Sequence, residues 1–466
     1  MLGIVVSRAD RASEHIGEHL QSLADWERRV DSSRPDPEGG GTVYRTDDAE
    51  LREFDGLHLY LDDVAEAFDD VDLLVFASRH SGETGPLLTA HHTGNFGPAE
   101  HGGEAGSLAR ACPNAHAEVL SALGEYAPPD YEVGMECTHH GPSSVGAPSM
   151  FVEVGSDEDQ WDDPGAARAV ARAILDLVDV APDRPVEAGG GVGGDETADA
   201  AADDDRYRRH LVGFGGGHYT PRFERIVRET DWAVGHVAAD WALDTMGMPS
   251  AAADVVARTF EQSRASYAVV AENRPALTET IEAEGYRVVG ESWVRAVAGV
   301  PLPLVDRLET TLVGVDEGLR FGDPARDADP DVSVETVTLP TALVERAEGI
   351  DGDRTRRVVA EAALAFETEE NGARLGARAA LVSGGGYDRI VDGLLDVLGT
   401  HYDDVQREAD TVIARKTAFD PAEARELGVP EGPKFGRLAD GEPVDINGDT
   451  VDPAQVTAER VDTFPL

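Results

Sequence analysis

Histidine is concentrated where this sequence passes from predicted strands into turns. Most of its 14 histidines lie between His80 and His236, in short segments rich in glycine, threonine or arginine. Imidazole titrates close to neutral pH and is also a common metal ligand. Ligands of open α/β sheets bind beyond the carboxyl ends of the strands, so we expect these segments to converge on one polar site.

The segment 135–142 carries the densest set of metal-binding side chains. It reads Met-Glu-Cys-Thr-His-His-Gly-Pro, which brings Glu136, Cys137, His139 and His140 close together in the chain. Carboxylate, thiolate and imidazole are all zinc ligands, and a catalytic zinc needs three protein ligands and a water. The spacing matches no standard zinc motif, and Cys137 is open to the alternative of a small buried residue. The segment predicts a metal site without fixing its ligands.

Two further segments follow predicted strands. One reads Ser-Arg-His-Ser, and its Arg79 has the planar donors that suit phosphate or ribose; the alternative is an exposed strand end. The other begins at His91 and reads His-His-Thr-Gly-Asn-Phe-Gly, where the glycines around Asn95 allow a ligand to approach the backbone. Adjacent residues of a strand point to opposite faces. We therefore expect His91 rather than His92 to face the site, with a polar turn as the alternative.

A glycine-rich turn and one more histidine complete the set. Residues 213–223 read Gly-Phe-Gly-Gly-Gly-His-Tyr-Thr-Pro-Arg-Phe. Such a turn at the start of a helix can bind phosphate through its N–H groups, although this one is neither a Walker loop nor a dinucleotide fingerprint. His218 is placed to be a general acid, a general base or a metal ligand. His236 ends another predicted strand, and a hydrogen-bonded structural role is its alternative.

The sequence offers no recognisable nucleophile motif. It contains no Gly-x-Ser-x-Gly elbow, and neither cysteine stands in a familiar Cys-His context. Activation of a water is therefore favoured over covalent acyl chemistry.

The elements that position these residues alternate as in an α/β protein. Strands are predicted at 2–6, 57–61, 73–77, 87–91, 131–137, 150–154, 210–219, 232–237, 267–271 and 286–289. Helices are predicted at 13–23, from 164, from 221, at 250–262 and at 276–284. Residues 183–205 are almost all small or acidic and predict a flexible insertion. We expect a layered mixed sheet flanked by helices, to which the chain on both sides of this insertion contributes, and two separate domains are the alternative.

The sequence changes character beyond about residue 300. Pro301 and Pro303 interrupt it, and His401 is the one histidine that remains. A helix is predicted at 355–366, and a strand at 379–383 enters a glycine run that echoes the turn at 215–217, either as a degenerate repeat or as an unrelated turn. We expect one domain at 1–300 and an additional α/β region at 301–466.

Acidity dominates the composition. The 90 acidic and 40 basic residues give a net charge of −50, and the only lysines are Lys416 and Lys434. Molar salt shortens the screening length to roughly 3 Å, so this surface suits a cytoplasmic protein of a salt-accumulating archaeon. The two cysteines, Cys112 and Cys137, make a disulfide framework improbable. We expect no membrane segment, and a monomer.

Taken in order, the histidine segments resemble the motif series of the archaeal and plant D-aminoacyl-tRNA deacylases. The motifs are Ser-Arg-His-Ser at 78–81, Gly-Asn at 94–95, Glu-Cys-Thr-His-His-Gly-Pro at 136–142, Gly-Gly-Gly-His-Tyr-Thr-Pro-Arg at 215–222 and Gly-His at 235–236. Each motif alone is weak, but together they span residues 1–295 in a specific order. The resemblance implies a zinc-dependent hydrolase that cleaves the ester between a D-amino acid and the terminal ribose of tRNA. It also implies a fold akin to phosphorylases and peptidyl-tRNA hydrolases.

The resemblance and the positions of the residues together assign roles. One or two zinc ions are expected at Glu136, His139, His140, His218 and His236. Proton transfer is expected from His80, His91 and His218. Contacts with the aminoacyl-tRNA are expected from Arg79, Asn95, Gly215, Gly216, Gly217, Tyr219 and Arg222.

The insertion at 183–205 and the region after residue 300 have no counterpart in the compact members of the family, and His92 follows His91 where a non-histidine is expected. Within the C-terminal region, residues 426–436 are similar to a short segment of tRNA 3′-end-processing nucleases of the metallo-β-lactamase fold. We therefore expect this region to contact tRNA. A protein of charge −50 must also offset repulsion from tRNA locally, and we expect a basic docking face at Arg206, Arg208, Arg209, Arg222, Arg225 and Arg228.

Two other functions would use the same residues. A zinc-dependent esterase or amidohydrolase acting on a small metabolite would use the histidines and be indifferent to tRNA. A non-catalytic tRNA-binding protein would use the glycine turns and arginines alone. The number of imidazoles at strand ends disfavours this second alternative, because binding rarely needs so many titratable groups.

Overall fold

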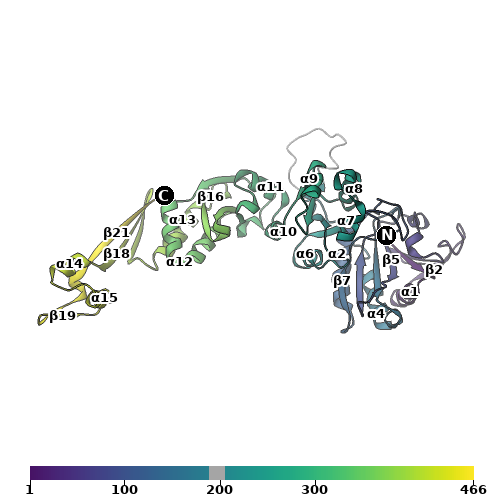
Figure 1. The fold of residues 1–466 in the computed structure, drawn as a ribbon, viewed down its shortest axis with the longest axis horizontal. Helices are drawn as coiled ribbons and strands as arrows, with labels where there is room; N and C mark the ends of the chain where they lie inside the picture. The colour runs from purple at the N-terminus through teal and green to yellow at the C-terminus, as the bar shows by residue number, and fades with distance from the viewer. Residues whose placement is uncertain (188–204) are drawn as a thin grey trace. The chain divides into compact units, whose positions relative to one another are not determined.

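The structure is a computed structural model that describes residues 1–187 and 205–466. Nearly all of the predicted insertion at 183–205 lies outside the described residues. The chain divides into two compact units, Met1–Gly299 and Val300–Leu466 (Figure 1). Within the described ranges, no helix has the length and apolar composition needed to cross a bilayer.

An eight-stranded mixed sheet forms one half of the first unit. Parallel pairing joins β4, β1, β5 and β8, whereas β6 runs antiparallel to β8 and parallel to β7. Across the sheet the strands are β2 (Glu27–Asp31), β3 (Gly41–Arg45), β4 (Ala49–Phe54), β1 (Leu2–Ser7), β5 (Leu73–Arg79), β8 (Ser149–Gly155), β6 (Leu87–His91) and β7 (Glu132–Met135). The expected layered mixed α/β fold is confirmed.

Both faces of this sheet are covered, which is why β1, β5 and β8 are apolar and buried almost throughout. The helices α1 (Arg11–Leu23), α4 (Pro164–Leu175) and α2 (Pro113–Tyr126) pack side by side on one face. Loops with the 3-10 turns η1 (His58–Tyr60) and η2 (Val64–Ala67) cover the other.

Capping residues set where two of these helices begin. The Asp10 carboxylate accepts hydrogen bonds from the backbone N–H groups of Ala12 and Ser13 at the start of α1. Asp163 caps α4 in the same manner, with proline at its first helical position. The helix predicted to start at residue 164 is therefore confirmed.

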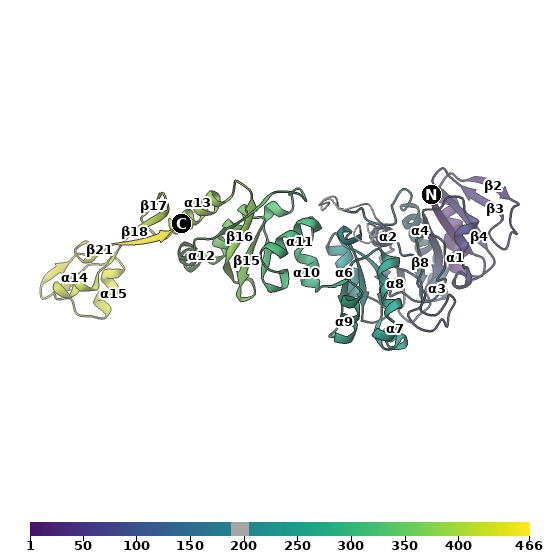
Figure 2. The ribbon, with the colours of Figure 1, turned by 90° about the horizontal axis from the view of Figure 1, so that it is seen from above.

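A separate four-stranded parallel sheet forms the other half of the first unit, so the expectation of one sheet is wrong. Its order is β10 (Ala233–Ala238), β9 (His210–Phe214), β11 (Tyr267–Val270) and β12 (Arg287–Val288). One face packs on α8 (Ala253–Ser263) and α9 (Pro275–Ala283), and the other on α6 (Pro221–Glu229) and α10 (Glu291–Ala296) (Figure 2). The apolar pattern predicted the strands but not their partners, because pairing is decided by contacts distant in sequence.

The sequence also mispredicted part of the first sheet. The predicted strand at 57–61 is the 3-10 turn η1, and the strands β2 to β4 were not predicted. β2 is exposed along most of its length, so it lacks the apolar alternation that identifies a half-buried strand.

The second unit contains mainly antiparallel sheets. A four-stranded sheet has the order β13 (Leu319–Phe321), β15 (Ala365–Glu369), β16 (Arg374–Val382) and β14 (Val334–Thr338) and packs with α12 (Thr341–Ala362) and α13 (Tyr387–Leu398). A three-stranded sheet has the order β17 (Asp404–Glu408), β18 (Thr411–Phe419) and β21 (Thr457–Pro465), and β19 (Val444–Ile446) pairs with β20 (Asp449–Val451). The glycine run after β16 thus leaves an antiparallel sheet, which favours an unrelated turn over a repeat of the one after β9.

Gly235 should be intolerant of a side chain. An added Cβ would lie 2.4 Å from both Cβ and Oγ of Ser263, at the end of α8. We expect Gly235→Ala to lower the free energy of unfolding by about 1–3 kcal/mol, because a packed core resists an extra methyl group. Thermal unfolding measures this, and Gly349→Ala is the control, since no atom lies within 4 Å of its added Cβ. Equal midpoints for the two variants would contradict the packing described.

Candidate functional site

A cavity of about 510 Å³ lies in the first unit, at the carboxyl ends of β5 and β8. Its wall combines charged and imidazole side chains with two leucines. The lining residues are Asp10, Leu57, Leu59, Ser78, Arg79, His80, Ser81, His101, His139, His140, Glu153 and His218. The segments 78–81, 135–142 and 213–223 therefore meet at the expected edge of the sheet.

Glu136 lies beneath this cavity, where β7 ends, and is only 1% exposed. Its Oε2 accepts a hydrogen bond from Nε2 of His218 at 2.7 Å, and its Oε1 lies 3.1 Å from Nδ1 of His80. Burial alone would raise the pKa of Glu136, but the imidazoles of His218 and His80 hold it well below its usual range. A buried negative charge is thus fixed at the centre of the site.

Glu153 supplies a second buried carboxylate, which the sequence analysis missed. It points from β8 into the cavity, with its two oxygens 3.7 Å from Nδ1 of His80 and 3.8 Å from Nε2 of His91. Its signal in the sequence was a lone acidic residue inside the apolar run Met-Phe-Val-Glu-Val of a buried strand. Burying a carboxylate costs free energy unless other groups compensate its charge, so an acidic residue in a buried strand indicates a function.

His80 lies between the two carboxylates. Burial would lower its pKa, but Glu136 and Glu153 raise it to about 11, so the ring carries a proton. Its Nε2 also lies 2.9 Å from the hydroxyl of Tyr219. The segment after β5 and the glycine turn after β9 therefore meet at one imidazole.

Three more imidazoles stack beside the carboxylates. The ring centroids of His91 and His139 lie 4.3 Å apart, and those of His139 and His140 lie 4.4 Å apart. Nδ1 of His139 donates to the Cys137 carbonyl, and Nδ1 of His140 donates to the Gly141 carbonyl, which leaves both Nε2 atoms as acceptors. Burial lowers the pKa of His139 well below its usual range and that of His140 to about 4, so both rings are neutral, the form that binds metals.

The ligand-type atoms are close enough for metal coordination. Four overlapping groups have their atoms within 4.8 Å of one another: His80, Glu136 and His218; His91, Glu136 and Glu153; His91, His139 and His140; and Cys137, His139 and His218. Burial and Glu136 raise the pKa of Cys137 to about 12, so a metal ion would have to displace the thiol proton in order to bind there. The nitrogen and oxygen groups are therefore the stronger candidates.

His236 lies apart from these groups, although the sequence placed it among the metal ligands. It is fully buried, its Nε2 donates to the Ala109 carbonyl, and its Nδ1 bonds the Thr138 hydroxyl. His92 also points away from the cavity and donates to the Gly235 carbonyl. Both nitrogens of His236 are occupied, so its structural alternative fits the geometry better than metal binding.

Several predicted substrate contacts are occupied by the protein itself. The Gly215 amide donates to the Ala238 carbonyl and the Gly216 amide to the Asp240 carboxylate, so neither is free to bind phosphate. The Asn95 amide donates to two backbone carbonyls of its own loop. Among the predicted contacts, Arg79 lies in the cavity wall, where its guanidinium stacks over Trp161 at 5.1 Å. The remaining member of the turn, Gly217, is exposed but does not line the cavity.

The predicted basic docking face is largely neutralised. Arg225 makes a bidentate ion pair with Glu291, and Arg222 lies 3.7 Å from the same carboxylate. The other paired members are Arg208 with Asp205, Arg209 with Glu187 and Asp231, and Arg228 with Glu224. These arginines balance local carboxylates, so clustering in the sequence did not produce a free positive surface.

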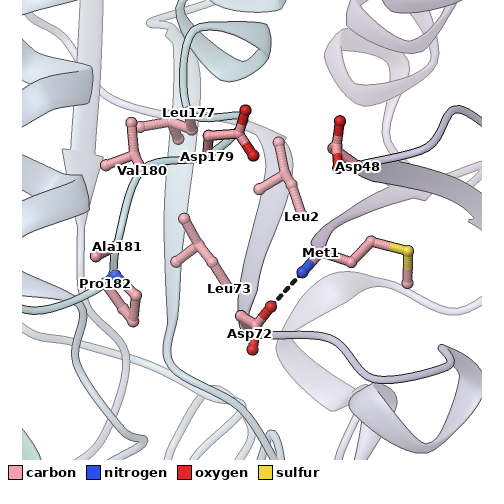
Figure 3. A pocket seen from close by; sticks show the side chains of 10 residues that line it. All are labelled: Met1, Leu2, Asp48, Asp72, Leu73, Leu177, Asp179, Val180, Ala181 and Pro182. Carbon is pink, nitrogen blue, oxygen red and sulfur yellow. Dashed lines mark hydrogen bonds and ion pairs between the residues drawn. The ribbon is translucent and has the colours of Figure 1, made fainter.

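A second cavity, of about 390 Å³, lies at the opposite ends of β1 and β5 (Figure 3). Asp48, Asp72 and Asp179 line it, and the Met1 ammonium pairs with Asp72. None of the described residues that line this cavity carries an imidazole, so it lacks the nitrogen ligands found at the first cavity.

The fold and the first cavity define the class: an α/β protein with carboxylates and imidazoles gathered in a strand-end cavity, a set of side chains that suits hydrolysis. A sequence profile for D-aminoacyl-tRNA deacylases matches residues 67–289. The chain belongs to the D-aminoacyl-tRNA deacylase family.

Relatives that align over nearly the whole chain support this family assignment. The chain is 55% identical to the D-aminoacyl-tRNA deacylase of Halorubrum lacusprofundi, with 100% of this chain and 97% of that protein covered. It is 54% identical to that of Haloarcula marismortui, with both chains fully covered. It is 31% identical to that of Methanococcoides burtonii, over 97% of this chain and 94% of the relative. The region beyond residue 300 is therefore shared with relatives of the same name.

A solved structure supports the fold. The crystal structure of a conserved protein of unknown function, AF0625, aligns with a TM-score of 0.52 and 28% identity, covering 63% of this chain and 96% of that one.

Acid should destabilise this fold through its buried neutral imidazoles. Burial lowers the pKa of His116 to about 4, against an ordinary value of 6.5. As pH falls from 6.5 towards 4, the unfolded chain binds a proton that the folded chain excludes, which costs about 1.4 kcal/mol per pH unit. His116→Leu should therefore reduce the loss of stability between pH 7 and pH 5. The measurement is the difference between the thermal midpoints of unfolding at these two pH values. An unchanged difference between the two midpoints would contradict a neutral buried His116.

Proposed function

We propose that this protein hydrolyses the ester of D-aminoacyl-tRNA, releasing the D-amino acid and tRNA, with a water activated at the Glu136 cluster. Membership of the deacylase family supports the reaction. One observation carries the site: Glu136, Glu153 and the imidazoles of His80, His139 and His218 lie at or directly beneath one cavity.

A metal ion fits the residues present. Among the described residues, Nε2 of His91 is buried without a hydrogen-bond partner, and Oε1 of Glu136 is buried with only the ion pair to His80 at 3.1 Å. Each belongs to a group of side chains close enough to share one ion. We propose zinc, because neutral imidazoles and carboxylates are its usual nitrogen and oxygen ligands.

Glu136 belongs to two of the groups of metal-binding side chains, one with His80 and His218 and one with His91 and Glu153. Because a protonated imidazole binds no metal, we propose the group with His91 and Glu153 as the one that leaves His80 free to donate a proton. When bound there, a zinc ion would lower the pKa of a bound water towards neutrality. The neutral imidazoles of His139 and His140 form a further group with His91.

The protein's own groups provide proton transfer and orientation. His80 in its charged form can donate from Nε2 to the Tyr219 oxygen, which leaves the Tyr219 hydroxyl free to donate to a second acceptor. His218 is the more exposed partner of Glu136, with 35% of its side chain accessible, and so is placed to pass a proton to the departing ribose oxygen. Arg79 would meet the tRNA end at the cavity wall.

The two units would have different roles, one in the reaction and one in binding tRNA. We place the reaction in residues 1–300, which contain the whole cavity. We place additional tRNA contacts in residues 301–466, and the enzyme in the cytoplasm, where aminoacyl-tRNA is used.

Matched D-tyrosyl- and L-tyrosyl-tRNA test the reaction. In molar KCl we expect rapid cleavage of the D ester, loss of activity with a chelator, and recovery with zinc. Cleavage of both esters would indicate a general esterase, and binding without cleavage would indicate a tRNA-binding protein; either result would contradict the proposal.

Glu153 provides a sharper test of the site. Glu153→Gln keeps the shape but removes the charge that faces His80 and His91, so we expect kcat to fall about 100-fold or more, together with loss of bound metal. The control is Glu132→Gln, an exposed carboxylate on β7, which should leave both measurements unchanged. Wild-type kcat and metal content in Glu153→Gln would remove Glu153 from the site.

A further inference from the structure

In the second unit, Lys416 and Arg460 form no ion pair with any carboxylate of the described residues, and the imidazole of His401 lies beside Lys416. We propose that His401, Lys416 and Arg460 bind phosphates of the tRNA backbone. This inference takes the identity of the polyanion, tRNA, from the proposed function. It adds a surface that binds the phosphate backbone of the tRNA.

Strand pairing brings the cations of Lys416 and Arg460 together. In the antiparallel pair of β18 and β21, Lys416 lies directly opposite Arg460, so their side chains leave the same face of the sheet as close neighbours. Nε2 of His401 lies 3.2 Å from Nζ of Lys416. His401 and Arg460 are exposed and Lys416 is half-buried, so all three are within reach of a ligand.

Two carboxylates beside this group, Asp462 and Asp403, accept hydrogen bonds from other residues and form no ion pair with it. Asp462, two residues along β21 from Arg460, accepts a hydrogen bond from the Tyr402 hydroxyl. Asp403 accepts one from the Thr417 amide at 2.6 Å. Across residues 1–187 and 205–466, no ion pair joins Lys416 or Arg460 to a carboxylate. Burial and the charges of Lys416 and Arg346 lower the pKa of His401, against an opposing effect of Asp462.

This arrangement is unusual for so acidic a chain. Like charges directly opposite each other destabilise a β-sheet, and this chain has 90 acidic residues but only two lysines. An anion bound by both the Lys416 and Arg460 side chains would relieve their repulsion and make the pair favourable.

Charge complementarity favours the tRNA backbone as that anion. The arginines around the glycine turn are paired with Asp205, Asp231 and Glu291, so they offer little free charge to tRNA. The group at Lys416 offers unpaired donors on a solvent-facing strand pair. Phosphate contacts of this kind hold a nucleic acid without reading its sequence, as an enzyme acting on many tRNAs requires.

The test compares two faces of one strand. The variant is Lys416→Gln with Arg460→Gln in the full-length chain. The matched control is Arg415→Gln, whose side chain leaves the opposite face of β18 and pairs with Asp404 at 3.0 Å. Binding of fluorescently labelled, uncharged tRNA is measured over a range of KCl concentrations. Hydrolysis of D-tyrosyl-tRNA and of D-tyrosine methyl ester is measured separately.

In the double variant we expect the slope of log Kd against log[KCl] to decrease by about two, because each of the two substituted cations would neutralise one phosphate. KM for D-tyrosyl-tRNA should rise about threefold or more at the lowest salt that keeps the protein folded, with kcat and methyl ester hydrolysis unchanged. Arg415→Gln should match the wild type. A wild-type slope in the double variant, or an equal decrease in Arg415→Gln, would overturn the inference. The binding measurement stays informative if the wild type cleaves neither ester, because that result would count against the proposed function alone.

Discussion

The site depends on keeping two carboxylates charged inside the protein. Removing a carboxylate from water costs several kcal/mol unless opposite charge and hydrogen bonds replace the lost hydration. Glu136 and Glu153 meet this requirement by sharing His80, and each has a further imidazole partner, His218 and His91 respectively. The fold must therefore deliver imidazoles from several distant segments to one point.

The two sheets of the first unit meet at this point. The Cys137 amide donates to the His218 carbonyl, and the Thr138 amide donates to the Val237 carbonyl, so the segment after β7 is joined to the turn after β9 and to β10. His236 strengthens the same junction by bridging Thr138 and Ala109. The metal-type ligands are thus positioned by backbone pairing and by a second set of imidazoles that face away from the cavity, which gives a rigid site.

Strand geometry explains what the sequence could predict. The alternation of side chains placed His91 towards the cavity and His92 away from it, and the position of histidines after strands predicted their convergence. The sequence could not show that β9 to β12 form their own sheet, because any apolar strand can pair with several partners. It also could not show that Glu153 points inwards, that His236 is fully hydrogen-bonded, or that Arg225 is paired with Glu291, since each depends on residues far away in the chain.

The central claim is that the Glu136 cluster is a metal centre with nitrogen and oxygen ligands. X-ray absorption at the zinc edge of the purified, metal-loaded protein tests it most directly. We predict a first shell of nitrogen and oxygen atoms at about 2.0–2.2 Å with no sulfur, and loss of that shell in Glu136→Gln. A zinc–sulfur distance of about 2.3 Å would place Cys137 in the site, and an unchanged spectrum in Glu136→Gln would place the metal elsewhere; either result would contradict the account.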